Sequence, residues 1–350
     1  MIKVEIDLNA LKANLRYIKA KAGVPVLAVV KADAYGHGLV RCAQGAIEAG
    51  ADYLGTATLS EAFALREAGI KAPLLAWLLP PGEDFKRAVQ LNIELGLSSL
   101  SAFDEVNAIP GAKIHLEVES GMGRGGFSNE WPELLNRDLS KVFGIFTHLA
   151  RADEPSEAQN KTQLENFEIF VNDLKARGVN PIRHLSNTAA TLSNPDAKYD
   201  MVRVGIAMYG LSPLGRDENL KPVMKIKAKL VLVKDLPKGH PIGYGASEVT
   251  KSDTKIGIVG MGYADGIPRN AKGAGVTFMG QTAPIIGRVS MDQFAVDLGA
   301  ESSAKSGDWV TVIGEKFDAY DWAQACQTIH YEITTRISQR VPRFYLEDKE

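Results

Sequence analysis

The sequence predicts an α/β protein in which a (β/α)₈ TIM-like barrel is followed by a mainly antiparallel β-domain. From about Pro25 to Gly210, short apolar runs alternate with amphipathic helical stretches such as 59–68 and 158–177, whose apolar residues recur at three- and four-residue spacing. Beyond residue 214, polar and apolar residues alternate, glycines recur every several residues and long helical patterns are scarce. That second pattern is typical of antiparallel strands.

Eight candidate strands are spaced along the first part of the chain, at 24–31, 51–56, 73–78, 93–97, 113–118, 142–147, 182–185 and 201–204. A closed parallel barrel has eight strands that alternate with helices, so this count favours a barrel over an open sheet. We therefore expect a barrel domain at 1–214 and a β-domain at 215–350, with residues 1–8 as a candidate strand added to the second domain.

Length and composition bound the function. A chain of 350 residues is too long for one ordinary core, and its hydrophobic fraction of 45% and charged fraction of 23% are typical of a soluble globular enzyme. A formal net charge of −2 gives no reason to expect a nucleic-acid partner, and the apolar run 74–79 is too short to span a membrane. The start of the chain lacks the apolar core of a signal peptide, and Cys42 and Cys326 indicate neither a disulfide framework nor a zinc site. A cytoplasmic protein without a metal is expected.

Polar residues stand where the barrel strands end, which is where (β/α)₈ enzymes carry their chemistry. Lys31 ends the first strand, Arg124 lies in a glycine-rich turn after the fifth, and His148, His184 and Arg203 end the sixth, seventh and eighth. Each residue alone is more typical of a solvated strand end or a structural histidine. Their convergence on one rim indicates an active site.

Nine motifs, in order across both domains, resemble those of the alanine racemase family, a group of fold-type III enzymes that use pyridoxal 5'-phosphate (PLP). In the first domain they lie at 28–38 (AVVKADAYGHG), 121–124 (GMGR), 147–153 (THLARAD), 184–188 (HLSNT) and 202–210 (VRVGIAMYG). The second domain adds 243–246 (GYGA), 262–266 (GYADG), 287–293 (GRVSMDQ) and 331–333 (YEI). One such motif is moderately specific, but the ordered set covers nearly the whole chain.

The resemblance implies a PLP-dependent racemase that interconverts L-alanine and D-alanine and supplies D-alanine for cell-wall peptidoglycan. It also implies a head-to-tail homodimer in which two subunits build each site. Lys31 resembles the lysine that carries the cofactor and serves as the base for the D-enantiomer. Tyr244 of the partner subunit resembles the base for the L-enantiomer.

The same resemblance implies the other site residues. The cofactor would be bound by Lys31, Tyr35, His148, Asn187, Thr188, Arg203, Gly205, Ile206 and Tyr331. Among these, the hydroxyls of Tyr35, Thr188 and Tyr331 and the amides of Gly205 and Ile206 would hold the phosphate. Substrate carboxylate would be bound by Arg124 and the main chain at Met291, with Arg124 also near the cofactor's phenolic oxygen. Supporting positions are His184, Glu117, Tyr263 and Asp292, and an outer ring of charges at Asp153, Arg269 and Arg288.

The chemistry of the side chains supports three of these implied roles. A phenol with a pKa of about 10 is a poor base at neutral pH, and a chain from Tyr244 through His184 to Arg203 is expected to favour its phenolate form. Arg203 would face the pyridine nitrogen of PLP, and because an arginine is a donor only, that nitrogen would stay unprotonated. Tyr263 would narrow the entrance and favour a small side chain.

Glu117 departs from the family pattern. Many members carry there, four residues before the Gly-Met-Gly-Arg motif, a lysine that is carbamylated so that its new carboxylate orients the arginine. Glu117 already ends in a carboxylate, so no carbamate is needed, although its reach is shorter. A water bridge or a shifted Arg124 would make up the difference; rotation of Glu117 toward another cation is the alternative.

Other functions remain open from the residues alone. A racemase of broader specificity differs only in pocket size, which depends on loops that the sequence does not place. A PLP-dependent decarboxylase would lack the Tyr244 base and the Arg203 pairing. A non-catalytic PLP-binding protein would need no second domain, and a Schiff-base aldolase would need no cofactor cradle.

Overall fold

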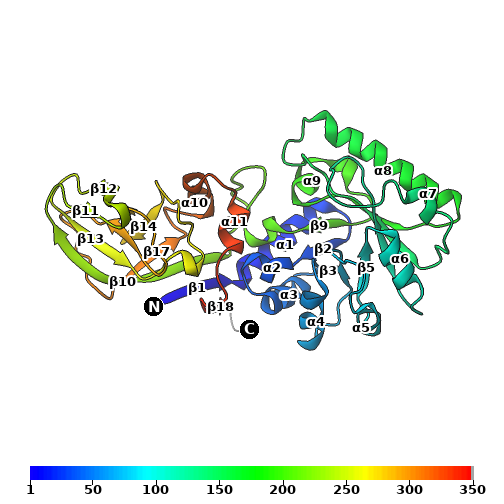
Figure 1. Ribbon diagram of the computed structural model, residues 1–350, viewed down its shortest axis with the longest axis horizontal. Coiled ribbons are helices and arrows are strands. Elements are labelled where there is room, and N and C mark those ends of the chain that lie inside the picture. Colours follow the sequence, from blue (N-terminus) through cyan, green and yellow to red (C-terminus); the bar gives the residue numbers. More distant parts are fainter. Residues whose placement is uncertain (348–350) are drawn as a thin grey trace. The chain divides into compact units, whose positions relative to one another are not determined.

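The computed structural model describes residues 1–347, which divide into two compact units (Figure 1). The barrel unit comprises Ala10–Ala34 and Leu39–Lys221. The sheet unit comprises Met1–Asn9, Tyr35–Gly38 and the chain from Pro222 onward. The predicted fold class, a (β/α)₈ barrel with a mainly antiparallel β-domain, is confirmed.

Eight parallel strands form the sheet of the barrel unit, in the spatial order β8-β7-β6-β5-β4-β3-β2-β9. A parallel bridge between His184 and Met201 closes the sheet into a ring. Each strand lies within one of the eight ranges that the sequence predicts. The strands are β2 (Val26–Val29), β3 (Tyr53–Thr56), β4 (Leu74–Ala76), β5 (Glu94–Leu97), β6 (Ile114–Glu117), β7 (Val142–Phe146), β8 (Ile182–His184) and β9 (Val202–Val204).

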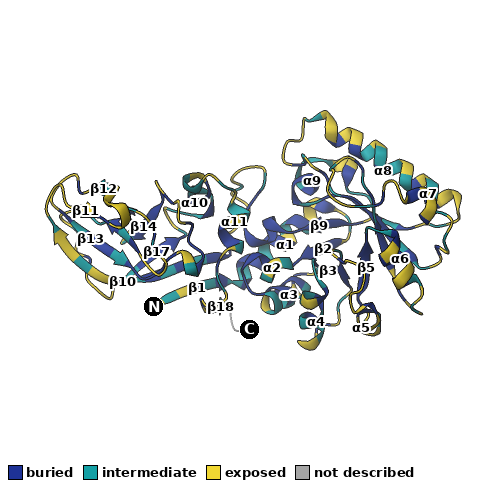
Figure 2. Ribbon diagram, in the orientation of Figure 1, coloured by how far each residue is buried: buried dark blue, intermediate teal, exposed yellow. Residues whose placement is uncertain are grey.

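Helices follow the strands and lie outside them (Figure 1). The longest helix, α8, has one buried face and one exposed face, as expected for a helix that packs on the outside of a sheet (Figure 2). Its buried residues recur every three or four positions and include Gln163, Phe167, Val171 and Leu174. The helices of this part are α1 (Leu8–Ala22), α2 (Lys31–Tyr35), α3 (Leu39–Glu48), α4 (Leu59–Glu67), α5 (Phe85–Gln90), α6 (Leu100–Asn107), α7 (Trp131–Leu134), α8 (Ala158–Ala176) and α9 (Thr188–Ser193), with 3₁₀ turns η1 (Pro195–Ala197) and η2 (Ile206–Tyr209).

Glycines on the barrel strands make room for two large rings. A Cβ at Gly55 would lie 2.5 Å from the ring of Trp77, and one at Gly96 would lie 2.8 Å from Trp77 Cβ. A Cβ at Gly144 would lie 2.1 Å from Nδ1 of His115. Since real Cβ atoms do not come so close to neighbours, glycine is required at these places for the rings to fit.

The sheet unit is built on the long strand β10 (Met224–Leu236), which pairs with three others. The hydrogen-bonded path runs β15-β14-β17-β10-β1-β18, and β13 joins β10 to β16. All pairings are antiparallel except that between β1 and β18. The remaining elements are β1 (Ile2–Asp7), β11 (Pro241–Ile242), η3 (Tyr244–Ala246), β12 (Glu248–Val249), β13 (Thr254–Val259), η4 (Tyr263–Asp265), β14 (Gly275–Phe278), β15 (Gln281–Pro284), β16 (Phe294–Asp297), β17 (Trp309–Ile313), α10 (Ala319–Cys326), α11 (His330–Thr335) and β18 (Arg343–Leu346).

The segment that leaves the barrel stays attached to it as far as Lys221, beyond the boundary at residue 214 expected from sequence. The fully buried side chain of Asn14 on α1 donates to the carbonyls of Met208 (3.2 Å) and Lys221 (2.8 Å) and accepts from the Lys221 amide (2.8 Å). The composition of the chain does not indicate where the barrel unit ends, because these hydrogen bonds join residues that are far apart in the sequence.

Candidate active site

Lys31 follows β2 directly and opens a turn of unusual backbone conformation. Ala32, Asp33 and Ala34 have φ values of 52°, 54° and 54°, in the left-handed region that costs an ordinary residue about 1–2 kcal/mol. The turn is held from outside, because the Glu61 carboxylate on α4 accepts from the Ala32 amide at 2.6 Å. The half-buried Lys31 side chain therefore starts from a fixed backbone at the C-terminal end of a barrel strand.

The surroundings of Lys31 favour a neutral amine. Burial lowers the pKa of Lys31, and the positive charges of Arg124 and Arg203 lower it further, against an opposing effect of Glu61. A neutral amine is the form that attacks a carbonyl group and accepts a proton.

Arg203 on β9 ties together three barrel strands. Its guanidinium is buried and donates to the carbonyls of His184 (2.6 Å) and Thr147 (2.7 Å), at the ends of β8 and β7. Burial lowers its pKa to about 10, with Glu117 opposing and Arg124 adding to the effect. The side chain is therefore a fixed cation at neutral pH, held by dipoles rather than by an ion pair.

Two histidines, His184 and His148, contact Arg203, and they differ in what their other ring nitrogen contacts. Nδ1 of His184 lies 3.2 Å from Nη1, and Nδ1 of His148 lies 3.4 Å from Nη2. The other nitrogen of His184, Nε2, contacts Nδ1 of His115 at 2.8 Å. Both ring nitrogens of the fully buried His184 are thus occupied, so the expected chain from Tyr244 through His184 to Arg203 is wrong at this residue. His148 is the histidine beside Arg203 that remains partly exposed.

Both histidines are neutral. Burial, with Arg203, Arg124 and Lys31, lowers the pKa of His148 to about 3. Burial, with His115 and Arg203, lowers the pKa of His184 well below its usual value. A neutral imidazole can accept a hydrogen bond from Arg203, which a charged one cannot.

The predicted phosphate residues of the barrel lie together after β8 and β9. Asn187 caps α9 by accepting from the Ala190 amide at 3.0 Å. The buried Thr188 hydroxyl accepts from the Gly205 amide at 3.0 Å, and Ile206 begins η2. Since the Thr188 hydroxyl accepts from Gly205, its own hydrogen can be donated outward, and it lies beside the start of η2, a position suited to an anion.

Arg124 lies in a loop that is organised by Glu119, a residue not singled out by the sequence analysis. The Glu119 carboxylate accepts from four successive amides, those of residues 121 (2.5 Å), 122 (2.6 Å), 123 (2.8 Å) and 124 (3.2 Å). These bonds hold the pKa of Glu119 below its usual value, although burial opposes them. A carboxylate just before a glycine-rich turn was the available signal.

Glu117 makes no ion pair with Arg124 or any other cation within the described residues 1–347. Its oxygens lie near Gly125, 3.7 and 3.8 Å from where a Cβ would stand. Burial raises the pKa of Glu117, while Arg203 and then Arg124 oppose the rise. The carboxylate thus acts on both arginines through space, and more strongly on Arg203.

In the sheet unit, Tyr35 and Tyr331 lie side by side, with ring centroids 6.3 Å apart. Burial raises the pKa of Tyr35. Both rings therefore belong to the same unit.

Three other predicted residues of the sheet unit expose their side chains: Tyr244 by 70%, Met291 by 54% and Tyr263 by 38%. The carbonyl of Met291 accepts from the Ala264 amide at 2.9 Å. Asp292 pairs with Arg340 at 2.7 Å. The charges predicted as an outer ring, Asp153, Arg269 and Arg288, are all exposed.

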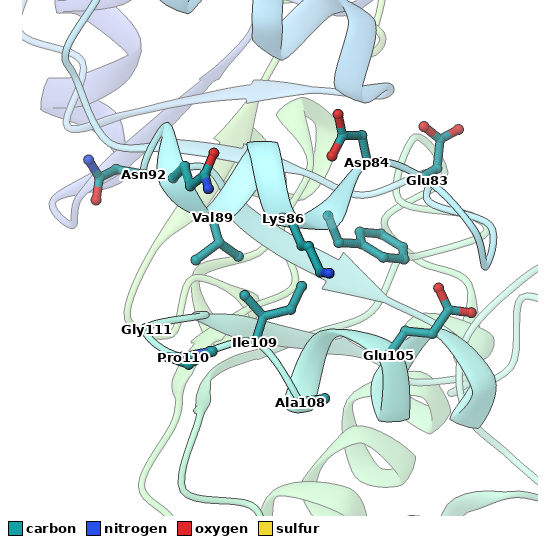
Figure 3. A pocket seen from close by; sticks show the side chains of 12 residues that line it. Glu83, Asp84, Lys86, Val89, Asn92, Glu105, Ala108, Ile109, Pro110 and Gly111 are labelled. Atoms are coloured by element: carbon teal, nitrogen blue, oxygen red, sulfur yellow. The ribbon is translucent and has the colours of Figure 1, made fainter.

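A separate hollow of about 910 Å³ lies between α5 and α6, lined by residues such as Glu83, Lys86, Glu105 and Ile109 (Figure 3). None of the predicted site residues lines it. Within residues 1–347, no group of His, Cys, Asp and Glu side chains is arranged to hold a metal ion. In the same range, none of the helices combines the length and apolar character that crossing a bilayer requires.

The charges around Lys31 fit an anionic cofactor. Lys31, Arg124 and Arg203 influence one another electrostatically, and Glu117 is the one carboxylate that acts on both arginines. Arg203 is buried, Lys31 is partly buried and Arg124 is exposed. Positive charge held away from water is costly until an anion compensates it. A phosphorylated aldehyde such as PLP would supply both the anion and a carbonyl for the Lys31 amine.

Two family models match the chain: the alanine racemase N-terminal domain over residues 6–213 and the alanine racemase C-terminal domain over residues 223–345. The alanine racemase of Streptomyces coelicolor is 42% identical over 376 residues, covering 99% of this chain and 96% of that protein. The alanine racemase of Thermobifida fusca is 43% identical, covering 98% and 97%.

Solved structures of alanine racemases are also similar to this chain. The alanine racemase of the D-cycloserine producer Streptomyces lavendulae has a TM-score of 0.96 and 42% identity, covering 99% of this chain and 97% of its own. The alanine racemase of Bartonella henselae with covalently bound pyridoxal phosphate has a TM-score of 0.91 and 27% identity, covering 99% of both chains.

The neutral histidines predict a pH dependence of stability. His148 and His184 have folded-state pKa values below the value of 6.5 for a free histidine, so their contribution is complete above that pH and is lost as the pH falls toward the folded-state values. Each adds a slope of about 1.4 kcal/mol per pH unit in that window, since only the unfolded chain binds the proton. Denaturant unfolding between about pH 7.5 and about pH 5 measures this slope. We expect His148→Gln to have a shallower slope than the wild type; equal slopes would contradict the assignment of His148 as neutral.

Proposed function

Because the chain belongs to the alanine racemase family, we propose that Lys31 holds PLP and that Lys31 and Tyr244 move the proton of alanine from one face to the other. The activity itself is that of the family, the interconversion of L-alanine and D-alanine with PLP as the cofactor. The observation that carries the proposed roles is the Lys31 side chain, fixed at a strand end among Arg124 and Arg203 with a lowered pKa.

When bound, PLP holds the amino acid covalently and draws electrons from its Cα, which makes the Cα proton acidic. The amine of Lys31 is the group that would hold the cofactor through its aldehyde carbon. For the phosphate, the hydroxyl of Thr188 and the amide of Ile206 would provide donors at the ends of β8 and β9. The Gly205 amide, which donates to Thr188 in this structure, is proposed as a further donor on the strength of the family resemblance. Tyr35 and Tyr331 are proposed as further donors on the strength of the family resemblance.

Arg203 is proposed to donate toward the pyridine nitrogen. Its guanidinium is fixed by two carbonyls and remains a donor at neutral pH. Because arginine only donates hydrogen bonds, it can face that nitrogen only when the nitrogen carries no proton, and an unprotonated ring would withdraw electrons from Cα less strongly. Moderate withdrawal limits side reactions at the cofactor.

Racemisation needs two bases on opposite faces of the substrate. The amine of Lys31 would serve as the base on one face. The partner subunit's Tyr244 is proposed for the other, and the cations Arg124 and Arg203 would stabilise its phenolate. His148, neutral and beside Arg203, takes the place that the sequence analysis gave to His184.

The second subunit is supported by what the sheet unit exposes. Tyr244 and Met291 are more than half exposed, which is unusual for large side chains with assigned roles in a closed site. We propose that each covers the barrel of a second copy, in a head-to-tail homodimer. Arg124 and the main chain at Met291 would then bind the substrate carboxylate, and Tyr263 would restrict the side chain to a small one.

A cytoplasmic location is also proposed. Within the described residues, neither Cys42 nor Cys326 forms a disulfide, as expected in a reducing compartment.

Borohydride reduction of the holoenzyme should fix the cofactor to Lys31. The purified protein should be yellow, and peptide mass spectrometry after reduction should locate the adduct on that residue. Lys31→Ala should be colourless, whereas Lys161→Ala, on the exposed side of α8, should keep both colour and adduct. An adduct on another lysine of the wild-type protein would overturn the assignment.

Mixed dimers test the shared site. Lys31→Ala and Tyr244→Ala should each be inactive as homodimers, because each lacks one base. In a heterodimer, one of the two sites regains both bases, so a statistical mixture should recover about a quarter of the wild-type activity. Heterodimers isolated with two different affinity tags and found inactive would show that a single chain builds the site.

Glu117 is proposed to replace the carbamylated lysine of other family members by its charge alone. Activity should then not depend on dissolved carbon dioxide. Glu117→Gln keeps the shape and removes the charge. Since no close ion pair is lost, we expect a measurable fall in kcat/KM of between about threefold and about tenfold. The exposed Glu133→Gln is the matched control. Steady-state kinetics in both directions that match the wild type for Glu117→Gln would show that another group positions Arg124.

A further inference from the structure

A chain of buried polar side chains leads from Arg203 across the barrel interior. His184 contacts Arg203 through Nδ1 (3.2 Å) and His115 through Nε2 (2.8 Å). Nε2 of His115 then contacts the Glu94 carboxylate at 2.9 Å. All four side chains are buried, and they come from β9, β8, β6 and β5. Neither Glu94 nor His115 has a part in the mechanism described so far.

The two ends of this chain fix every hydrogen atom between them. Arginine only donates, so Nδ1 of His184 must accept, and the proton of that neutral ring lies on Nε2. Nδ1 of His115 therefore accepts from His184, and its own proton lies on Nε2. Glu94, as a carboxylate, only accepts. The order of donors and acceptors is consistent from one end to the other.

The surrounding residues are fitted to this chain. Gly144 on β7 leaves the space in which the His115 ring lies, since a Cβ there would be 2.1 Å from Nδ1. The ring of Phe146 stacks on His184 at 5.1 Å, and Lys113 pairs with the second oxygen of Glu94 at 3.2 Å. Barrel interiors are usually filled by branched aliphatic residues, so two histidines and a carboxylate in this layer need a reason.

The reason lies in what happens if the order reverses. With its proton on Nδ1, His184 would present a donor to the Nη1 donor of Arg203, and the two would repel one another. Arg203 would then lose one acceptor and shift on its remaining carbonyl bonds. The carboxylate at the far end prevents the reversal, because only the Nε2 proton of His115 can satisfy it.

We propose that Glu94 and His115 are positioning residues of the racemase, which fix the tautomer of His184 and through it the direction in which Arg203 donates to the cofactor. The effect on the reaction rests on the proposed contact between Arg203 and the ring nitrogen of PLP. The tautomer itself belongs to the chain and exists with or without the cofactor.

Glu94→Gln tests the proposal with little change of shape. Its amide can turn a donor toward His115, which allows both rings to reverse. In cofactor-free protein labelled with nitrogen-15 in histidine, the wild type should show His184 protonated on Nε2 alone, and the variant should show a mixture. In the holoenzyme, the visible absorption maximum should shift and kcat should fall about tenfold with KM within about twofold, because Arg203 acts after the substrate is bound.

Lys113→Met is the matched control, because it removes the other partner of Glu94 and leaves the His115 contact intact. It should keep the wild-type tautomer, spectrum and kcat. If Glu94→Gln does not fold, Glu94→Asp carries the same test, since it keeps the charge but withdraws it from His115.

An unchanged His184 tautomer in the Glu94 variant would overturn the proposal, whatever happens to the melting temperature. A changed tautomer with an unchanged absorption maximum and kcat would overturn the link to the reaction. A cofactor adduct on a lysine other than Lys31 would instead refute the proposed function and leave the nitrogen-15 result standing, so the two failures are distinguishable.

Discussion

The buried guanidinium of Arg203 joins the ends of three barrel strands and the chemistry that they carry. It donates to carbonyls at the ends of β7 and β8 while standing on β9, next to the bridge that closes the barrel. A buried charge without a carboxylate partner must be satisfied by dipoles, and here every one of them comes from backbone or from a neutral imidazole. The same hydrogen bonds therefore hold the strand ends together and fix the orientation of the arginine.

Burial and the same charge together act on the ionisation of its neighbours. Burial is the main cause of the lowered pKa values of Lys31, His148 and His184, and Arg203 lowers all three further, so that the two imidazoles are neutral close to permanent cations. In a low-dielectric interior such repulsion is strong and weakens only when an anion enters. An anionic cofactor would relieve the repulsion, and in the proposed function it would meet the Lys31 amine, whose pKa is lowered.

Strain is concentrated beside the reactive lysine rather than spread through the barrel. The left-handed turn after Lys31 is held by the Glu61 carboxylate, which also accepts from the amides of Ala57 and Thr58 at the start of α4. One side chain thus caps a helix and fixes the turn. The Gly-rich loop of Arg124 is organised in a similar way by Glu119, so both charged groups start from backbones that carboxylates hold in place.

Local pattern determined the order and type of the elements, because strand and helix periodicities depend on neighbours in the chain; all eight barrel strands lie in their predicted ranges. It also placed Lys31 and Arg203 at strand ends and Arg124 in the glycine-rich turn after the fifth strand. Which histidine faces which partner was decided only by the tertiary structure: His148 and His184 look alike in sequence, yet only His184 has both nitrogens occupied. The physical reason is that these hydrogen bonds depend on the distance between atoms of different strands. The spacing of residues along the chain does not determine that distance.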